Sequence, residues 1–148
     1  MRDRQLDNPC HNRGMIYAKS DPARYRTLFS DGKHDGIADT IAEHGGEHAG
    51  FRPHDLLEAA LAACVNMTVR MYADHHNIPL QDVTTKVTLD RTHPEKVTFR
   101  YEVELDGDLS PEQREKLAQA ARACPVRKTL SKQIEFKCGD DLAGAAPR

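Results

Sequence analysis

The sequence predicts an α+β fold with largely antiparallel sheets, and three observations lead to this prediction. Strand-like runs occur in pairs joined by turn signals rather than in strand–helix–strand crossovers. A long apolar segment, residues 54–76, separates the two pairs and has the composition of one helix. The 148 residues are enough for one domain with a substantial core and too few for two. We therefore expect one domain over residues 15–138, a polar arm at 1–14 and a flexible tail at 139–148.

The first pair of strands belongs to the N-terminal part of the domain. Residues 15–18 and 24–30 are short strand-like runs. The sequence Ser-Asp-Gly-Lys at residues 30–33 is typical of a turn, and it leads into residues 34–40. An N-terminal hairpin is the expected result.

A loop rich in glycine and histidine, residues 41–52, follows this hairpin. His44 and His48 could be metal ligands by residue type, but no nearby cysteine or carboxylate pattern completes a site. We expect a solvated loop that delivers the chain to the long helix, and no bound metal or cofactor.

The segment 54–76 contains neither glycine nor proline and is rich in leucine, alanine and methionine. At about 100° per residue, one narrow side of this helix carries its polar residues: Asp55, Glu58, Asn66, Arg70 and Asp74. Cys64 lies roughly opposite, among Leu57, Ala60, Leu61, Thr68 and Met71. The Cys64 thiol should therefore face the core, and other elements should cover most of the helix. The interrupting charges and short apolar runs argue against a membrane span.

The clearest alternation of apolar and polar residues follows this helix. Residues 83–89 and 97–105 each alternate as strands do, and the sequence His-Pro-Glu-Lys at 93–96 turns the chain between them. This pattern predicts a second hairpin with one buried face. Residues 133–138 have the composition of a final strand.

A second helix begins at a capping box, with Ser110 as N-cap, Pro111 at the first helical position and Gln113 at the reciprocal position. One face of this helix carries four small or apolar residues: Leu117, Ala120, Ala121 and Cys124. Pro125 then interrupts it. Because the residue before a proline avoids helical dihedral angles, we expect Cys124 at a break, as N-cap of a short following helix.

Composition excludes some classes of function. A net charge of −2 without a basic cluster gives no electrostatic reason to bind nucleic acid. The N-terminus lacks the apolar stretch of a secretory signal, so we expect a cytoplasmic protein without a membrane partner. Its cysteines should then be thiols. None lies in a CxxC pair, which weakens a zinc-ribbon or thioredoxin-like interpretation.

Cys64 and Cys124, on the inward faces of two helices, are the one constellation that suggests a reaction. Periodicity alone favours small buried hydrophobes, which is what free cysteines usually are. Three features point to chemistry. A helix begins after Cys124, and its amides and dipole favour a thiolate. Arg127 and Lys128 add positive charge. Cys64 stands beside short side chains that leave room for an approaching molecule. Cys10 and Cys138 are interpreted as incidental or structural thiols.

Two segments carry a resemblance to a known family. PHDLLEAALAACVNMTVRMYADHHNIPL and ELDGDLSPEQREKLAQAARACPVRKTL resemble the OsmC/Ohr family, nearer its OsmC-like branch than the organic hydroperoxide resistance proteins. The similarity covers roughly residues 25–137. It implies an intertwined homodimer in which sheets from both chains wrap the long central helices. It also implies a peroxidase in which Cys64 attacks a hydroperoxide and Cys124 resolves it as a disulfide, restored by a dithiol such as a lipoylated protein.

The resemblance also implies polar partners for the thiolate, an Arg from the N-terminal hairpin and a Glu near the start of the central helix. Arg24 and Arg26 are candidates for the arginine. Ten residues before Cys64, where the hydroperoxide resistance branch has its Glu, this chain has His54, followed by Asp55. Asp55 is a candidate to hold the arginine in place of that Glu.

Three hypotheses follow. The first is a cytoplasmic, homodimeric, thiol-dependent peroxidase for organic or lipid hydroperoxides, with Cys64 and Cys124 as its redox pair. The second is a non-enzymatic protein that binds a small apolar ligand at the dimer interface, which the missing Glu favours. The third is a general redox or disulfide-exchange protein, against which the absence of CxxC counts.

Overall fold

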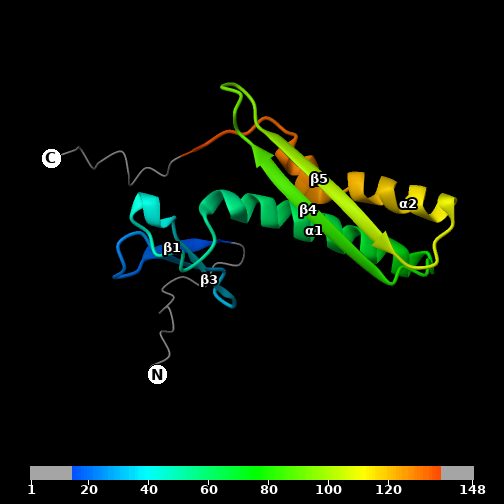
Figure 1. Ribbon diagram of the computed structural model, residues 1–148, viewed down its shortest axis with the longest axis horizontal. Helices are drawn as coiled ribbons and strands as arrows, with labels where there is room; N and C mark the ends of the chain where they lie inside the picture. The colour runs from blue at the N-terminus through cyan, green and yellow to red at the C-terminus, as the bar shows by residue number, and fades with distance from the viewer. Residues whose placement is uncertain (1–14, 138–148) are drawn as a thin grey trace. The chain divides into compact units, whose positions relative to one another are not determined.

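The computed structural model describes residues 15–137 of the chain. These residues form two compact units, unit one up to Ala59 and unit two from Ala60 onward. Figure 1 shows the helices and strands of both. The predicted arm at 1–14, the predicted tail at 139–148, Cys10 and Cys138 lie outside the described residues, and the prediction of one domain stays a prediction.

Unit one contains a three-stranded antiparallel sheet in the order β1-β2-β3. Its strands are β1 (Tyr17–Ser20), β2 (Thr27–Ser30) and β3 (Asp35–Ala38). The predicted turn joins β2 to β3. Asp31 Oδ1 accepts the backbone N–H groups of Lys33 and His34, both at 2.8 Å, and Gly32 has a φ of 90°, which suits glycine. The predicted hairpin is therefore confirmed, with a third strand added.

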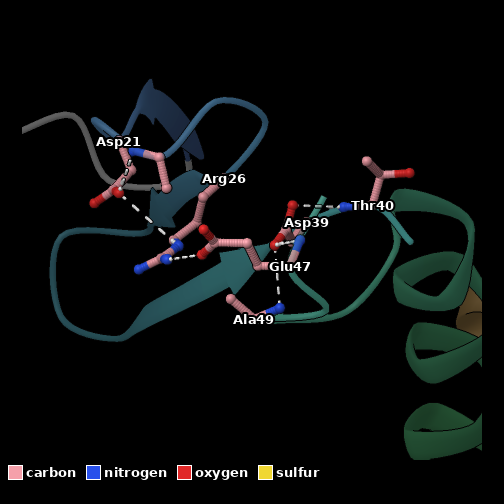
Figure 2. Close-up of polar contacts among 7 residues, drawn as sticks. Asp21, Arg26, Asp39, Thr40, Glu47 and Ala49 are labelled. Carbon is pink, nitrogen blue, oxygen red and sulfur yellow. Dashed lines mark hydrogen bonds and ion pairs between the residues drawn. The ribbon is translucent and has the colours of Figure 1, made fainter. Parts of the chain in front are cut away.

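A buried carboxylate organises the loop that follows β3. Asp39 is 4% exposed and accepts the backbone N–H groups of Thr40, Glu47 and Ala49 at 2.7, 3.1 and 3.1 Å (Figure 2). Three donors to one charged acceptor hold the loop around a short 3₁₀ helix, η1 (Ala42–His44). The two histidines of the loop, His44 and His48, are exposed as expected. No group of side chains that could hold a metal ion occurs among residues 15–137.

The long helix, α1 (Pro53–His75), agrees with its prediction to within one residue at each end. Pro53 occupies the first helical position, where its missing N–H costs nothing. Asp55 accepts the backbone N–H of Arg52 at 3.1 Å, half of a capping box. After the helix, Asn77 takes a left-handed φ of 51°, a conformation that asparagine tolerates and that ends helices.

The buried face of α1 differs from the prediction. It carries Leu61, Val65, Val69 and Ala73 at intervals of four residues. Leu57 and Met71, expected inside, are 44% and 69% exposed, and α1 is covered over less of its surface than expected. The stripe is shifted because the hairpin and α2 contact only one side of the helix within unit two.

By length and composition alone, the charges in α1 do not exclude a membrane span. Among the described helices, α1 is long enough and apolar enough to cross a membrane, with a mean hydropathy of 1.2 over its best 18 residues. Core helices of soluble proteins pass the same test of length and composition. The Leu61 to Ala73 stripe belongs to the hydrophobic core of unit two.

Unit two packs the second hairpin and two further helices against α1. Its strands are β4 (Asp82–Asp90) and β5 (Thr98–Asp106), paired antiparallel with Val83 opposite Leu105 and Val87 opposite Tyr101. The side chains of this face join the core, as predicted. Arg70 of α1 donates to the carbonyl oxygens of Leu80 and Gln81 at 2.6 and 2.9 Å and so attaches the helix to the chain entering β4.

The helix pair follows the sequence closely. α2 (Pro111–Arg122) begins with the full Ser110–Gln113 capping box, and α3 (Pro125–Leu130) begins directly after Cys124. The predicted final strand is wrong over its described part. Residues 133–137 are exposed and irregular, because no strand within residues 15–137 pairs with them.

Candidate functional site

Cys64 and Cys124 meet in unit two. Both are free thiols; Cys124 is fully buried in the hydrophobic core, and Cys64 is half-buried at its edge. The two sulfurs are joined by a hydrogen bond. Two residues sixty positions apart in the sequence are thus brought into direct contact.

Local sequence explains how each cysteine is placed. Cys64 follows Leu61 by three residues and precedes Val65, so it lies beside the buried stripe of α1 rather than within it. Cys124 has φ −49° and ψ 127°, the extended conformation that Pro125 imposes on its predecessor. Its side chain therefore leaves the end of α2 and faces the first amides of α3.

The pKa values of the two thiols are shifted in opposite directions. Burial raises the pKa of the Cys64 thiol, but hydrogen bonds from the Cys124 thiol, the Val126 N–H and the Thr68 hydroxyl outweigh it, and the net pKa is lowered. Burial and the neighbouring Cys64 sulfur raise the pKa of Cys124, although the amides of Arg127 and Val126 oppose this. The arrangement favours a Cys64 thiolate that accepts a hydrogen bond from a protonated Cys124.

Thr68 is a site residue that the sequence analysis did not single out for chemistry. Its hydroxyl donates to the Cys64 carbonyl oxygen at 2.7 Å and also lies within reach of the Cys64 sulfur. This one proton is shared between two acceptors, so the Cys124 and Val126 donors contribute more to the lowered pKa of Cys64. The spacing of four residues from Cys64 is the signal that could have identified it.

A cavity of about 460 Å³ opens between α1 and α2. Neither cysteine belongs to its lining, but Thr68, one helical turn after Cys64, and Ala123, which precedes Cys124, do. The full lining is Thr68, Met71, Tyr72, His75, Lys116, Gln119, Ala120 and Ala123. Its size lies within the usual range of small-molecule sites.

The polar residues predicted for the site lie in unit one. Arg26 donates to Glu47 Oε2 at 2.7 Å, with Asp21 Oδ1 3.9 Å from its Nε (Figure 2). The Arg24 guanidinium lies over the Tyr25 ring, 5.0 Å from its centroid. These two arginines contact side chains of their own sheet and loop.

Asp55 pairs with Arg52 rather than with either predicted arginine. Arg52 donates from Nη2 to Asp55 Oδ1 at 2.7 Å and from Nε to Asp55 Oδ2 at 3.0 Å, a bidentate pair across the first turn of α1. This bond lowers the pKa of Asp55. The proximity of Arg52 in the sequence explains this pairing, because a partner three residues away is reached without any tertiary contact. His54, next to Asp55, is exposed.

Solved structures share this fold. An OsmC-like protein of Mycoplasma pneumoniae is 20% identical, with a TM-score of 0.67 over 82% of this chain and 89% of that chain. The organic hydroperoxide resistance protein OhrB of Bacillus subtilis is 24% identical, with a TM-score of 0.57 over 79% and 89%. A Vibrio cholerae structure with captopril bound in one of its active sites is 17% identical, with a TM-score of 0.56 over 88% and 90%.

At these low identities the solved structures show the fold alone, whereas the sequence itself supports assignment to a family. No curated protein is significantly similar to it. A family model described as OsmC-like protein, however, matches residues 45–139, more than half of the chain and both cysteines. The α+β fold with antiparallel sheets and a long helix agrees with this match. The chain belongs to the OsmC-like protein family.

Proposed function

We propose that the protein is a thiol-dependent peroxidase that reduces organic hydroperoxides, with Cys64 as nucleophile and Cys124 as resolving thiol. The observation that carries this proposal is the hydrogen-bonded pair in which the pKa of Cys64 is lowered and that of Cys124 is raised. A thiolate is the reactive form of cysteine, and a neighbouring protonated thiol is what a sulfenic acid needs for resolution. Several proteins of the same fold are named organic hydroperoxide resistance proteins.

The reaction balances with these two groups and an external dithiol. The Cys64 thiolate attacks the terminal oxygen of ROOH, the O–O bond breaks, and RO⁻ takes a proton from solvent to leave as an alcohol. Cys64 is then a sulfenic acid. The Cys124 sulfur attacks the Cys64 sulfur, and the hydroxyl leaves with the thiol proton as water, which yields a disulfide. A dithiol opens this disulfide by two exchange steps and is itself oxidised.

The remaining parts of the proposal concern assembly and the polar residues. Met67 and Met71 expose 59% and 69% of their surfaces on α1, which supports a homodimer that covers this helix. Arg24, Arg26, His54 and Asp55 are proposed to serve the same site in the assembled protein. We place the protein in the cytoplasm.

A second candidate function is non-enzymatic binding of a small apolar ligand. The cavity between α1 and α2 favours it, as does His54 at the position of the family's Glu. The captopril in the Vibrio cholerae structure is an example of a small molecule held in an active site of this fold.

A thiol count by mass spectrometry separates the two candidates. One equivalent of cumene hydroperoxide should convert Cys64 and Cys124 to a disulfide that dihydrolipoamide reverses. Cys64→Ser should abolish peroxide consumption, whereas Cys138→Ser, the matched control, should leave it unchanged. Survival of both thiols in the wild type, or full turnover by Cys64→Ser, would reject the peroxidase and favour the ligand-binding candidate.

A further inference from the structure

The chain around Cys124 is basic, although the protein as a whole is slightly acidic. Residues 122–132 contain no aspartate or glutamate and carry four cations: Arg122, Arg127, Lys128 and Lys132. We refer to these four residues as the basic patch. This local excess corrects the expectation, drawn from the net charge of −2, that the chain has no basic cluster. Residues 122–132 contain no aromatic side chain, so they lack the stacking surface that single-stranded nucleic acid needs.

The cations of the basic patch are exposed and lack acidic partners. All four residues are exposed, and none of them forms an ion pair with another residue between 15 and 137. Lys116 of α2, by contrast, pairs with Glu112. Arg127 donates to the Arg122 carbonyl oxygen at 3.1 Å, which holds its guanidinium at the end of α2. The patch therefore keeps a positive charge that no carboxylate of the described residues neutralises.

The basic patch lies beside the thiol pair. Arg127 follows Val126, whose N–H donates to the Cys64 sulfur, and Arg122 lies two residues before Cys124. Cys64 is the half-buried member of the pair, so a molecule that attacks its sulfur approaches the start of α3. Attraction between exposed charges reaches about 10 Å at 0.1 M salt. A reductant that arrives here is therefore attracted or repelled according to its charge.

We propose that the basic patch is the docking surface for a dithiol-carrying protein whose reactive thiols are flanked by carboxylates. The four cations are spread over residues 122–132, farther than a small dithiol reaches, which favours a protein surface as their partner. The inference rests on the proposed function and names the class of its reductant. The patch acts on the encounter and its rate, without a part in the exchange steps.

The exchange that this docking serves needs no further reactant. One thiolate of the reductant attacks the Cys64 sulfur, the Cys64–Cys124 bond breaks, and Cys124 leaves as a thiolate that takes a proton from solvent. The second thiolate then attacks the reductant's own sulfur in the mixed disulfide and releases Cys64. The reductant ends as a disulfide, having given up two electrons and two protons.

Two synthetic peptides test the charge preference on the full-length protein. Both carry the same Cys-Gly-Pro-Cys dithiol, flanked by four glutamates in one and by four glutamines in the other. The Cys64–Cys124 disulfide is formed beforehand with diamide, which takes two electrons and two protons from two thiols, so no peroxide is needed. Thiol counting by mass spectrometry follows its reduction. Each rate is divided by the rate of the same peptide with hydroxyethyl disulfide, a neutral reference.

The wild type should react about tenfold faster with the acidic peptide at about 0.01 M salt, because several weak exposed ion pairs act together. The preference should vanish at about 1 M salt, where the screening length is about 3 Å. Lys128→Gln combined with Lys132→Gln should reduce the preference to about threefold. Lys86→Gln combined with Arg100→Gln is the matched control, because it removes two exposed cations from the hairpin and should leave the preference unchanged.

The outcomes separate this inference from the peroxidase itself. If both peptides reduce the disulfide at equal normalised rates, or if the patch variant and the control variant behave alike, the docking surface alone is overturned. If diamide forms no Cys64–Cys124 disulfide, the redox pair of the proposed function fails, and this inference fails with it. A salt-sensitive preference that only the patch variant weakens supports the docking surface.

Discussion

The two units of the chain stabilise an acidic side chain with different kinds of hydrogen-bond donor. In unit one, Asp39 takes its three hydrogen bonds from backbone N–H groups, and these lower the pKa of its carboxyl group. In unit two, Cys64 takes one of its hydrogen bonds from the thiol of Cys124, which can itself lose its proton. Backbone donors fix a permanent charge that organises a loop. A thiol donor leaves the Cys64 thiolate reactive, because the Cys124 thiol can transfer its proton and then itself react.

The largest effects should be on folding, and they test whether the two units differ in stability. Leu117→Ala should cost about 2–5 kcal/mol of the free energy of unfolding, since Leu117 is fully buried in unit two. Asp39→Ala should also destabilise, because it leaves three backbone donors without their acceptor in unit one. Urea unfolding followed by circular dichroism measures both.

The expected result is one cooperative transition that both substitutions shift, as one domain over residues 15–138 requires. Asp35→Ala, at the exposed start of β3, is the control for Asp39 and should have little effect. Two transitions, each sensitive to one substitution, would show that the units unfold independently and that the one-domain prediction is wrong.

The next effect concerns the thiol donor. Cys124→Ala removes the hydrogen bond to Cys64, so the pKa of Cys64 should rise. Alkylation of Cys64 by iodoacetamide, measured as a function of pH, should then need a higher pH, and the rate at neutral pH should fall severalfold. Cys138→Ser serves as the control for loss of a cysteine. An unchanged pH profile would show that the hydrogen bond from Cys124 is not the cause of the lowered pKa of Cys64.

The smallest effect should come from Thr68→Val, which keeps the shape of the side chain and removes its hydroxyl. The pH profile of Cys64 alkylation should move in the same direction as in Cys124→Ala but by less, because the Thr68 proton is shared with the Cys64 carbonyl. Thr68→Ser retains the hydroxyl and should resemble the wild type. A shift larger than that of Cys124→Ala would reverse the ranking of the two donors.

Local chemistry made the helix boundaries predictable. Ser110 and Gln113 form the capping box that their spacing requires, and Cys124 takes the extended conformation that Pro125 demands. Each of these depends on neighbours within four residues. The alternation of apolar and polar residues over 83–105 is also a local pattern, and it was enough to predict the second hairpin and its buried face.

The features that the sequence could not predict depend on distant contacts. The apolar residues of α1 extend around most of the helix, so periodicity could not select the stripe of Leu61 and Val65 over Leu57 and Met71. The contact between Cys64 and Cys124 also depends on the tertiary fold. The family resemblance implied it, whereas residue spacing did not predict it. The pairing of Asp55 with Arg52 was local and could have been predicted from their spacing of three residues.

Because Cys124 is fully buried, thiol–disulfide exchange at a Cys64–Cys124 disulfide should always begin at the Cys64 sulfur. An incoming thiolate can reach the half-buried Cys64 sulfur, so the mixed disulfide forms there and Cys124 is the leaving group. A thiol with a raised pKa leaves slowly. Under the proposed function, the protein should consume its first equivalent of peroxide in a rapid burst and then turn over at the slower pace of its reductant.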